Sequence, residues 1–389
     1  MHENLLLFSI FLIFAGAAVL ATIALYTRQS LLVAYMLLGI LFGPWGLKWV
    51  TDAAIIQKIG DVGIVFLLFL LGLHLQPQRL LHVLRKVSWV ALISSAIFSA
   101  MFFAICGLCG FPWMESLVIA LALMFSSTII GLKLLPTTVL HHQHTGEMMI
   151  GILLMQDLIA ILLLVIVRSA NEGHFNWLLL GRVFLFLPLI VVFAFVFERY
   201  ILRILFRRFD RIREYMFLLA IAWCLSLAHL ANAIGLSNEI GAFIAGVSLA
   251  TSPISVYIAE SLKPVRDFFL VLFFFAIGAS FNISYFSEVA IPAVILTLVL
   301  LVAKPVVFRV LLRQVGESAY VGWEIGARLG QASEFSILLA YVAIQEVLIG
   351  QAASNLIQMV TMLTFIVSSY LVVLRYPTPV AISDKLRRD

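Results

Sequence analysis

The chain has 389 residues, of which 63% are hydrophobic and only 12% are charged, and its formal net charge is +5. A soluble domain carries roughly 25% charged residues, so this composition excludes a soluble globular protein and predicts one that crosses a membrane several times. The mean hydropathy of +1.12 points the same way. The basic excess does not indicate a nucleic-acid partner, because the basic residues lie mostly in short connections between apolar runs.

Apolar runs of about 17 to 25 residues recur along the whole chain, and a helix of that length crosses roughly 30 Å of hydrocarbon. They predict an all-α polytopic membrane protein with about thirteen transmembrane helices over residues 1–375, followed by a short cytoplasmic tail, 376–389. The first run has no basic residue before it and is read as a span rather than a cleaved signal. The predicted spans are 5–26, 30–47, 54–76, 88–110, 115–136, 147–168, 178–206, 215–234, 237–254, 267–284, 289–312, 320–345 and 350–374.

Lysine and arginine are distributed unevenly between the two sides of these spans. Connections that face the cytoplasm carry the excess of basic residues, which predicts an outside N-terminus and a cytoplasmic C-terminus. The outer connections hold Lys48, Lys58 and, at a span edge, Arg182. The inner connections and the tail hold Arg28, Arg79, Arg85, Lys86, Arg207, Arg208, Arg211, Arg213, Lys263, Arg266, Arg313, Arg375, Lys385, Arg387 and Arg388.

Three pairs of short motifs recur at a nearly constant offset. The pairs are Gly72 with Gly278 and Ser127 with Ser333, each 206 positions apart, and Gly39 with Gly246, 207 apart. This offset corresponds to seven spans, an odd number, so the second copy must be inserted upside down relative to the first. The pattern predicts inverted six-helix repeats over about 5–168 and 215–374, joined by a connector helix at about 178–206.

The spans 115–136 and 320–345 have unusually polar, glycine-rich centres. Matched interruptions in two inverted halves indicate a binding site at the repeat interface, so we expect two crossed, discontinuous helices here. The alternative is that the hydroxyls bond within their own helices or permit close helix packing. The polar centres are Ser126, Ser127, Thr128 and Gly131 in the first span, and Gly326, Arg328, Gly330, Gln331, Ser333 and Glu334 in the second.

The span 147–168 carries Gln156 and Asp157 side by side near its midpoint. An ionised carboxylate at the centre of a membrane helix costs roughly 2.5–3.5 kcal/mol on insertion scales, so it is rarely retained without a role or a partner. A carboxyl that binds either a proton or a monovalent cation, but not both, couples the movements of the two ions. We therefore expect a cation and proton site at Asp157, with oxygen ligands from Gln156, Thr128 and Ser127.

Three further charges are predicted within the membrane: Lys304, Arg328 and Glu334. We expect them to compensate charge around the site. Two alternatives remain, in which Asp157 forms a salt bridge with Lys304 or Arg328, or Arg328 and Glu334 pair with each other. A nucleophile with a base, or a set of metal ligands, is not evident, so neither an enzyme nor a bound cofactor is expected.

Four ordered motifs resemble those of Kef-type transporters in the monovalent cation:proton antiporter-2 family. They are GEMMIGILLMQDLIAILLL, GAFIAGVSLATSP, FFFAIGASFN and GARLGQASEFSILLA. The resemblance covers residues 1–375 and implies a sodium/proton-antiporter-like fold with two crossed broken helices and a dimerisation domain. It also implies that Asp157 is the alternating site, that Lys304 is the core lysine, and that Thr128 is the polar residue of the first broken helix.

The resemblance implies a homodimer in a bacterial inner membrane, surrounded by lipid, that exchanges K+ for H+ by alternating access. Gln156 replaces the first aspartate of electrogenic relatives, which favours electroneutral exchange. Two alternatives remain: Na+/H+ antiport, and a ligand-gated K+ efflux channel on the same scaffold. Kef-type transporters usually continue into a nucleotide-binding regulatory domain, and these residues contain no GxGxxG loop, so any such domain or subunit is expected outside this sequence.

Overall fold

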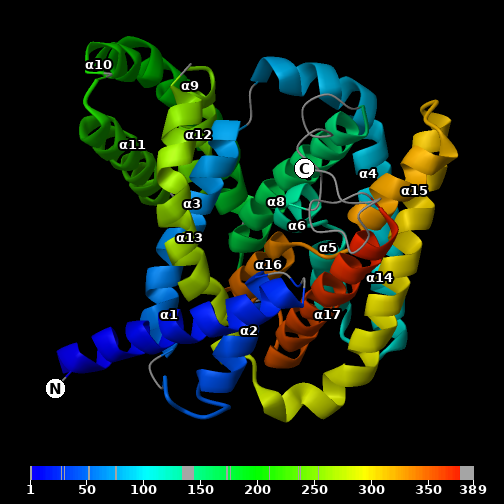
Figure 1. Ribbon diagram of the computed structural model, residues 1–389. Coiled ribbons are helices and arrows are strands. Elements are labelled where there is room, and N and C mark those ends of the chain that lie inside the picture. The colour runs from blue at the N-terminus through cyan, green and yellow to red at the C-terminus, as the bar shows by residue number, and fades with distance from the viewer. Residues whose placement is uncertain are drawn as a thin grey trace. The chain divides into compact units, whose positions relative to one another are not determined.

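The structure is a computed structural model that describes residues 2–27, 29, 31–50, 53–74, 77–133, 144–171, 174–175, 177–209, 211–234, 236, 238–252 and 254–376. The predicted tail lies outside these residues, apart from Tyr376. The described residues group into two compact units, one drawn from 1–17, 35–81 and 175–280 and the other from 18–34, 82–174 and 281–389. Each unit takes helices from both predicted halves of the chain, and the elements are drawn in Figure 1.

The elements are named in chain order. From the N-terminus to the middle of the chain they are α1 His2–Tyr26, α2 Leu31–Phe42, α3 Ala53–His74, α4 Pro77–Leu108, α5 Trp113–Leu123, α6 Thr128–Lys133, α8 His144–Ser169, and the paired two-residue strands β1 Ala170–Asn171 and β2 His174–Phe175. They continue as α9 Trp177–Phe197, the π-helical turn η1 Glu198–Leu202, α10 Arg203–Arg208, α11 Arg213–Ala233, α12 Asn238–Ala250, α13 Ser255–Ser280, the 3-10 turn η2 Ile283–Tyr285, α14 Phe286–Gln314, α15 Ala319–Arg328, α16 Glu334–Gln345 and α17 Gln351–Arg375.

The predicted spans correspond closely to these helices. Over the described residues, thirteen helical segments match the thirteen spans when α5–α6, α9–α10 and α15–α16 are each taken as one. Seven of the described helices are long and apolar enough to cross a membrane, and α2, α5, α12 and α16 are shorter apolar helices. The prediction of an all-helical, multi-pass membrane protein is confirmed.

Two predicted connections are helical instead. α13 begins at Ser255, well before the predicted start at 267, and includes Lys263 and Arg266. Carboxylates neutralise these two charges within the helix, since Lys263 pairs with Glu260 and Arg266 with Asp267. α4 likewise begins at Pro77 and includes the basic residues that the charge pattern assigned to a loop. A charged stretch is therefore a poor guide to where these helices begin.

Glycines permit close contacts between helices of the first unit. A Cβ at Gly39 would lie 2.0 Å from the Phe275 carbonyl oxygen, and one at Gly278 would lie 2.0 Å from the Met36 carbonyl oxygen. No side chain fits at such distances, so α2 and α13 touch backbone to backbone.

The same contact recurs between α3 and α12, which lie side by side in Figure 1. A Cβ at Gly72 would lie 2.5 Å from the Phe243 carbonyl oxygen, and one at Gly246 would lie 2.1 Å from that of Phe69. If an inverted repeat relates α2 to α12 and α13 to α3, it maps the contact between α2 and α13 onto the contact between α12 and α3. The packing therefore supports a repeat. Its limits at 5–168 and 215–374 remain predictions.

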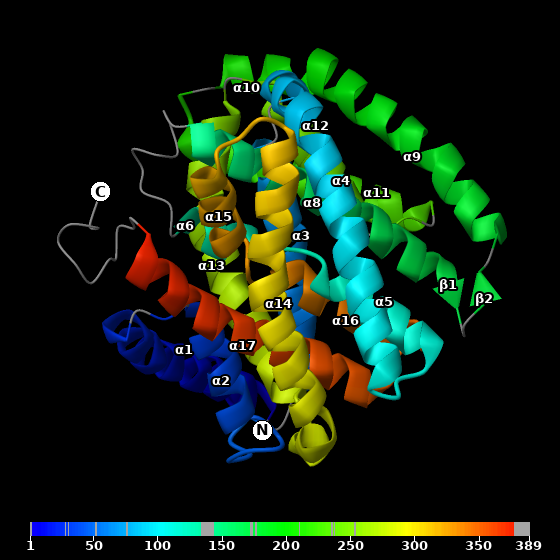
Figure 2. The same ribbon diagram turned by 90° about the vertical axis from the view of Figure 1, so that its right-hand side faces the viewer.

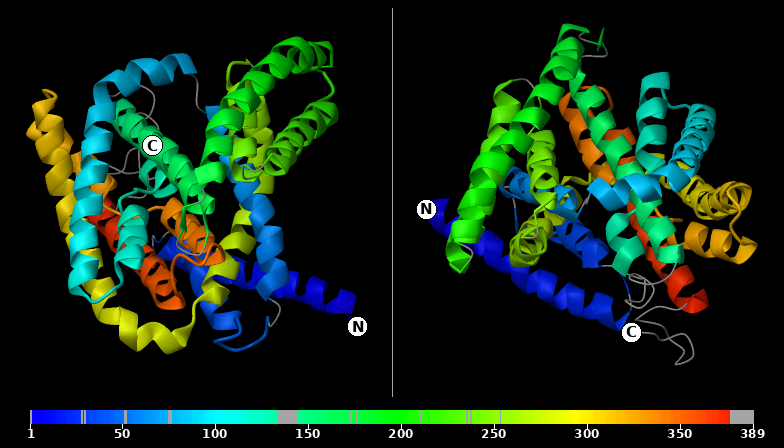
Figure 3. Two further views of the ribbon diagram at one scale, coloured as in Figure 1. Left: turned by 180° about the vertical axis from the view of Figure 1, so that it is seen from behind. Right: turned by 90° about the horizontal axis from the view of Figure 1, so that it is seen from above.

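Two helices of the second unit are interrupted, as predicted. The first span is broken between α5 and α6 and the second between α15 and α16. α14 and α15 run side by side in Figures 2 and 3, and α17 packs against α14 and α16. Both interruptions and α8 lie in this unit, so all the predicted site residues belong to one compact body.

Candidate functional site

Gln156 and Asp157 lie in the middle of α8 and are buried, with 0% and 2% of their surfaces exposed. The Thr128 hydroxyl, at the first residue of α6, donates to the Asp157 carboxylate, 3.1 Å from Oδ2 and 3.3 Å from Oδ1. Among the described residues it is the only hydrogen-bond partner of that carboxylate, and no lysine or arginine nitrogen there lies within 4.0 Å of it. Asp157 is thus a buried acid without a cationic partner in the described part of the chain.

Gln156 holds the backbone at the first interruption. Its amide oxygen Oε1 accepts a hydrogen bond from the Ser126 backbone N–H at 3.1 Å. Its amide nitrogen Nε2 is buried and has no hydrogen-bond partner among the described residues. A buried donor left unpaired costs about 1–3 kcal/mol, so a further oxygen, such as that of a water molecule, fits beside it.

Lys304 lies between the two interruptions. This fully buried residue of α14 donates from Nζ to the Phe125 carbonyl at 2.6 Å, to the Gln331 carbonyl at 2.8 Å and to Ser126 Oγ at 3.2 Å. Both carbonyls follow the C-terminal ends of half-helices, α5 and α15, where unpaired carbonyls concentrate negative charge. Lys304 therefore donates to the carbonyls at two helix ends at once.

The two interruptions also bond to each other directly. Ser126 Oγ donates to the Leu329 carbonyl at 2.8 Å, and Ser336 Oγ donates to the Ala122 carbonyl at 2.6 Å. The first bond joins the break in one span to the end of α15 in the other, and the second joins α16 to α5, which pack against each other. Two of the carbonyls freed by the breaks are thus satisfied by the opposite span, and such partners make an interrupted helix tolerable inside a membrane.

Ser127 and Ser333, the pair 206 positions apart, have the same structural role. Ser127 Oγ accepts the Ile130 N–H at 3.1 Å at the start of α6, and Ser333 Oγ accepts the Phe335 N–H at 3.1 Å at the start of α16. Each caps the second half of a broken helix. The part of Ser127 in cation binding remains a prediction.

The two remaining predicted charges, Arg328 and Glu334, lie on different half-helices, α15 and α16. Glu334 is the first residue of α16, a position that favours an anion. Arg328, buried at the end of α15, pairs with Glu324 one turn earlier: Nη2 and Nε lie 2.9 and 3.1 Å from Glu324 Oε1. Sequence reasoning missed Glu324, although an acid four residues before an arginine is a recognisable helix pair.

Sequence reasoning also missed the contribution of α17. Thr364 Oγ1 accepts the Ala332 N–H at 3.1 Å, and Ser368 Oγ donates to Gln331 Oε1 at 2.9 Å. The Gln331 amide then reaches the Ser127 carbonyl at 3.5 Å. α17 therefore holds the second interruption, and Gln331 extends that support to the first. No spacing rule links α17 to residues more than 30 positions away.

Thr364→Val is expected to lower the free energy of unfolding by about 1–3 kcal/mol, because it leaves the Ala332 N–H buried without an acceptor. The control is Thr361→Val, whose hydroxyl donates to the Ile357 carbonyl of its own helix. Thermal unfolding of both variants in one detergent, followed by tryptophan fluorescence, measures the difference. Equal shifts would contradict the role assigned to Thr364.

Comparisons with known proteins agree with this geometry. The solved structure of the sodium proton antiporter MjNhaP1 from Methanocaldococcus jannaschii is similar with a TM-score of 0.69, over 96% of this chain and 97% of that one. The sequences are only 14% identical, so this likeness shows the fold alone. The family model described as "Sodium/hydrogen exchanger, transmembrane" matches residues 10–373. Because that match spans nearly the whole chain, the protein belongs to the sodium/hydrogen exchanger family, whose members are cation/proton antiporters rather than enzymes.

Proposed function

We propose that this protein exchanges a monovalent cation for a proton, one for one, by alternating access to Asp157. The observation that carries the proposal is the buried carboxylate whose only described hydrogen-bond partner is the neutral Thr128 hydroxyl. An ionised carboxylate in such surroundings needs a compensating positive charge. A proton or a desolvated cation supplies it, and each excludes the other.

The two oxygens of Asp157 and the hydroxyl of Thr128 are the hard ligands that such a cation prefers. Gln156 Oε1 is engaged by the Ser126 N–H, so we propose that Gln156 acts mainly by holding that segment beside Asp157. The unpartnered Nε2 next to it favours a water molecule that completes the coordination shell. Lys304 acts through the helix ends whose carbonyls accept its hydrogen bonds.

Electroneutral exchange follows from one carboxyl that alternates between two singly charged ligands. The second acid, Glu334, keeps one protonation state through the cycle in this proposal. If Glu334 also gained and lost a proton, each cycle would move net charge, so the stoichiometry is open to measurement.

The cation that we propose is potassium, and the support for it is the resemblance of the Gln156–Asp157 segment to Kef-type transporters. The family as a whole is described as exchanging sodium. The proposal also includes a homodimer in a bacterial inner membrane, with the N-terminus outside and the C-terminus in the cytoplasm. The basic residues of the inner connections support that orientation.

The test uses purified protein in liposomes with an internal pH-sensitive dye and, in parallel, on a solid-supported membrane that records transported charge. Gradients of KCl, NaCl or choline chloride are imposed in turn. The proposal expects a KCl gradient to change internal pH without a transported current, and choline to do nothing. A current without a pH change would show that the protein is a channel rather than an exchanger. A pH change with NaCl but not with KCl would show that the cation is sodium rather than potassium.

A further inference from the structure

The outward face of α14 carries a continuous apolar stripe. Exposed aliphatic side chains recur there every three or four residues, which is one face of a helix. They are Ile291, Val294, Leu298, Val302, Val306 and Val310, each between 42% and 71% exposed. In a chain that spans a membrane, such a stripe lies against acyl chains.

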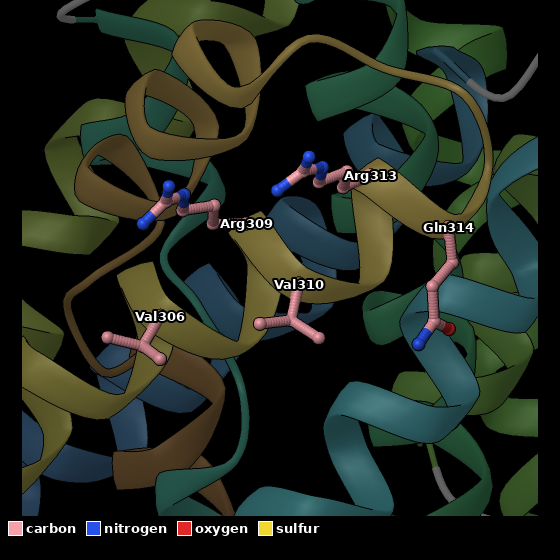
Figure 4. A pocket seen from close by; sticks show the side chains of 5 residues that line it. All are labelled: Val306, Arg309, Val310, Arg313 and Gln314. Atoms are coloured by element: carbon pink, nitrogen blue, oxygen red, sulfur yellow. The ribbon is translucent and has the colours of Figure 1, made fainter.

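The stripe ends at two arginines. Arg309 and Arg313 are one helical turn apart, and Figure 4 shows their side chains extending from α14 in the same direction, with Val306 and Val310 nearby. Together with Gln314 these residues line a pocket of about 450 Å³. Among the described residues, no carboxylate lies within 4.0 Å of either guanidinium.

Neighbouring aromatic residues place this pocket at the membrane surface. The Arg309 guanidinium lies 5.0 Å from the Trp323 ring centroid, and Tyr320 and Trp323 of α15 are 63% and 38% exposed. Tryptophan and tyrosine are enriched at the level of lipid headgroups. The arginines are therefore at the depth where lipid phosphates lie.

The arginine site is also built on a rigid support. A Cβ at Gly322 of α15 would lie 2.8 Å from the Arg309 Cα, so the two helices touch closely beside the pocket. The stacked tryptophan restrains the Arg309 side chain. Such preorganisation lowers the entropy lost on binding.

We propose that this pocket binds one anionic phospholipid. Its phosphate lies between Arg309 and Arg313, which offer paired N–H donors, and its acyl chain lies along Val306 and Val310. Gln314 adds an amide donor to the headgroup. An anion is favoured over a zwitterion, because two guanidinium groups one helical turn apart concentrate positive charge.

The test is native mass spectrometry of the protein titrated with phosphatidylglycerol, phosphatidylcholine or inorganic phosphate. The variants are Arg313→Gln, whose side chain is exposed, and Arg309→Gln/Arg313→Gln. The control is Lys263→Gln/Arg266→Gln, which removes two charges that Glu260 and Asp267 already neutralise. The first lipid is expected to bind roughly fivefold more weakly for each pocket arginine lost, with phosphatidylglycerol affected and the control unchanged.

Val310→Asn separates a lipid from free phosphate. It is expected to weaken phosphatidylglycerol binding, because it places an amide against the acyl chain, and to leave phosphate binding unaffected. The proposal is overturned if the arginine variants bind phosphatidylglycerol like the native protein, if phosphatidylcholine binding falls equally, or if inorganic phosphate competes and Val310→Asn has no effect. Exchange in liposomes does not enter this readout, so the lipid site and the proposed function can fail separately.

Discussion

Asp157→Asn is expected to reduce cation-driven proton movement to the rate of protein-free liposomes. Asparagine has nearly the shape of aspartate and still accepts the hydrogen bond that Thr128 donates to the carboxylate. It carries no charge and gains no proton at neutral pH, so it removes both states between which the site alternates. The rate of internal pH change under a KCl gradient measures the loss.

Two further variants show whether the loss is specific. Glu288→Gln removes one negative charge from the exposed first turn of α14 and is expected to keep the native rate. Asp157→Glu keeps a carboxyl but displaces it by one methylene, so a reduced but measurable rate is expected. If Asp157→Asn retains exchange while its unfolding temperature is unchanged, the carboxyl that alternates must be another one, and Glu334 becomes the first candidate.

The helices could be predicted because their signal is local. Apolar runs indicate membrane spans, and the polar centres of two matched spans indicate where helices break, since both signals lie within one stretch of sequence. The 206-residue offset even links Ser127 to Ser333, which cap equivalent half-helices in the structure. The limits of α4 and α13 were harder to predict, because both helices continue through charged stretches, and in α13 the basic side chains pair with carboxylates of the same helix.

Contacts of the site were predictable only in part. Lys304 could be identified from the sequence as a buried charge, and one alternative was a salt bridge with Asp157. Its partners in the structure are instead two backbone carbonyls and a hydroxyl. The sequence does not reveal which carbonyl a helix break frees, because every residue has a backbone carbonyl whatever its type. For the same reason the support from Thr364 and Ser368 has no signature in the sequence, where they look like ordinary hydroxyls of an apolar helix.

Lys304→Met is expected to destabilise the protein more than any other change to this site. Methionine has a similar length and no donor, so the Phe125 and Gln331 carbonyls lose their hydrogen bonds to the ammonium. Each buried acceptor left unpaired costs about 1–3 kcal/mol, and the two together about 2–6 kcal/mol. The negative ends of α5 and α15 also lose the positive charge between them.

Removing a buried ammonium also removes its own desolvation cost, which opposes this loss. The loss is expected to dominate, because the two carbonyls belong to the backbone and remain in place, and Lys304 is the hydrogen-bond donor found for each of them among the described residues. Lys263→Met is the control, since its side chain is 41% exposed and pairs with a surface carboxylate, a contact that contributes about 0–1 kcal/mol. Thermal unfolding of both variants in the same detergent separates the two cases. Equal unfolding temperatures would mean that the hydroxyl and amide bonds between the interruptions are sufficient to hold them, and that Lys304 is retained for transport rather than for stability.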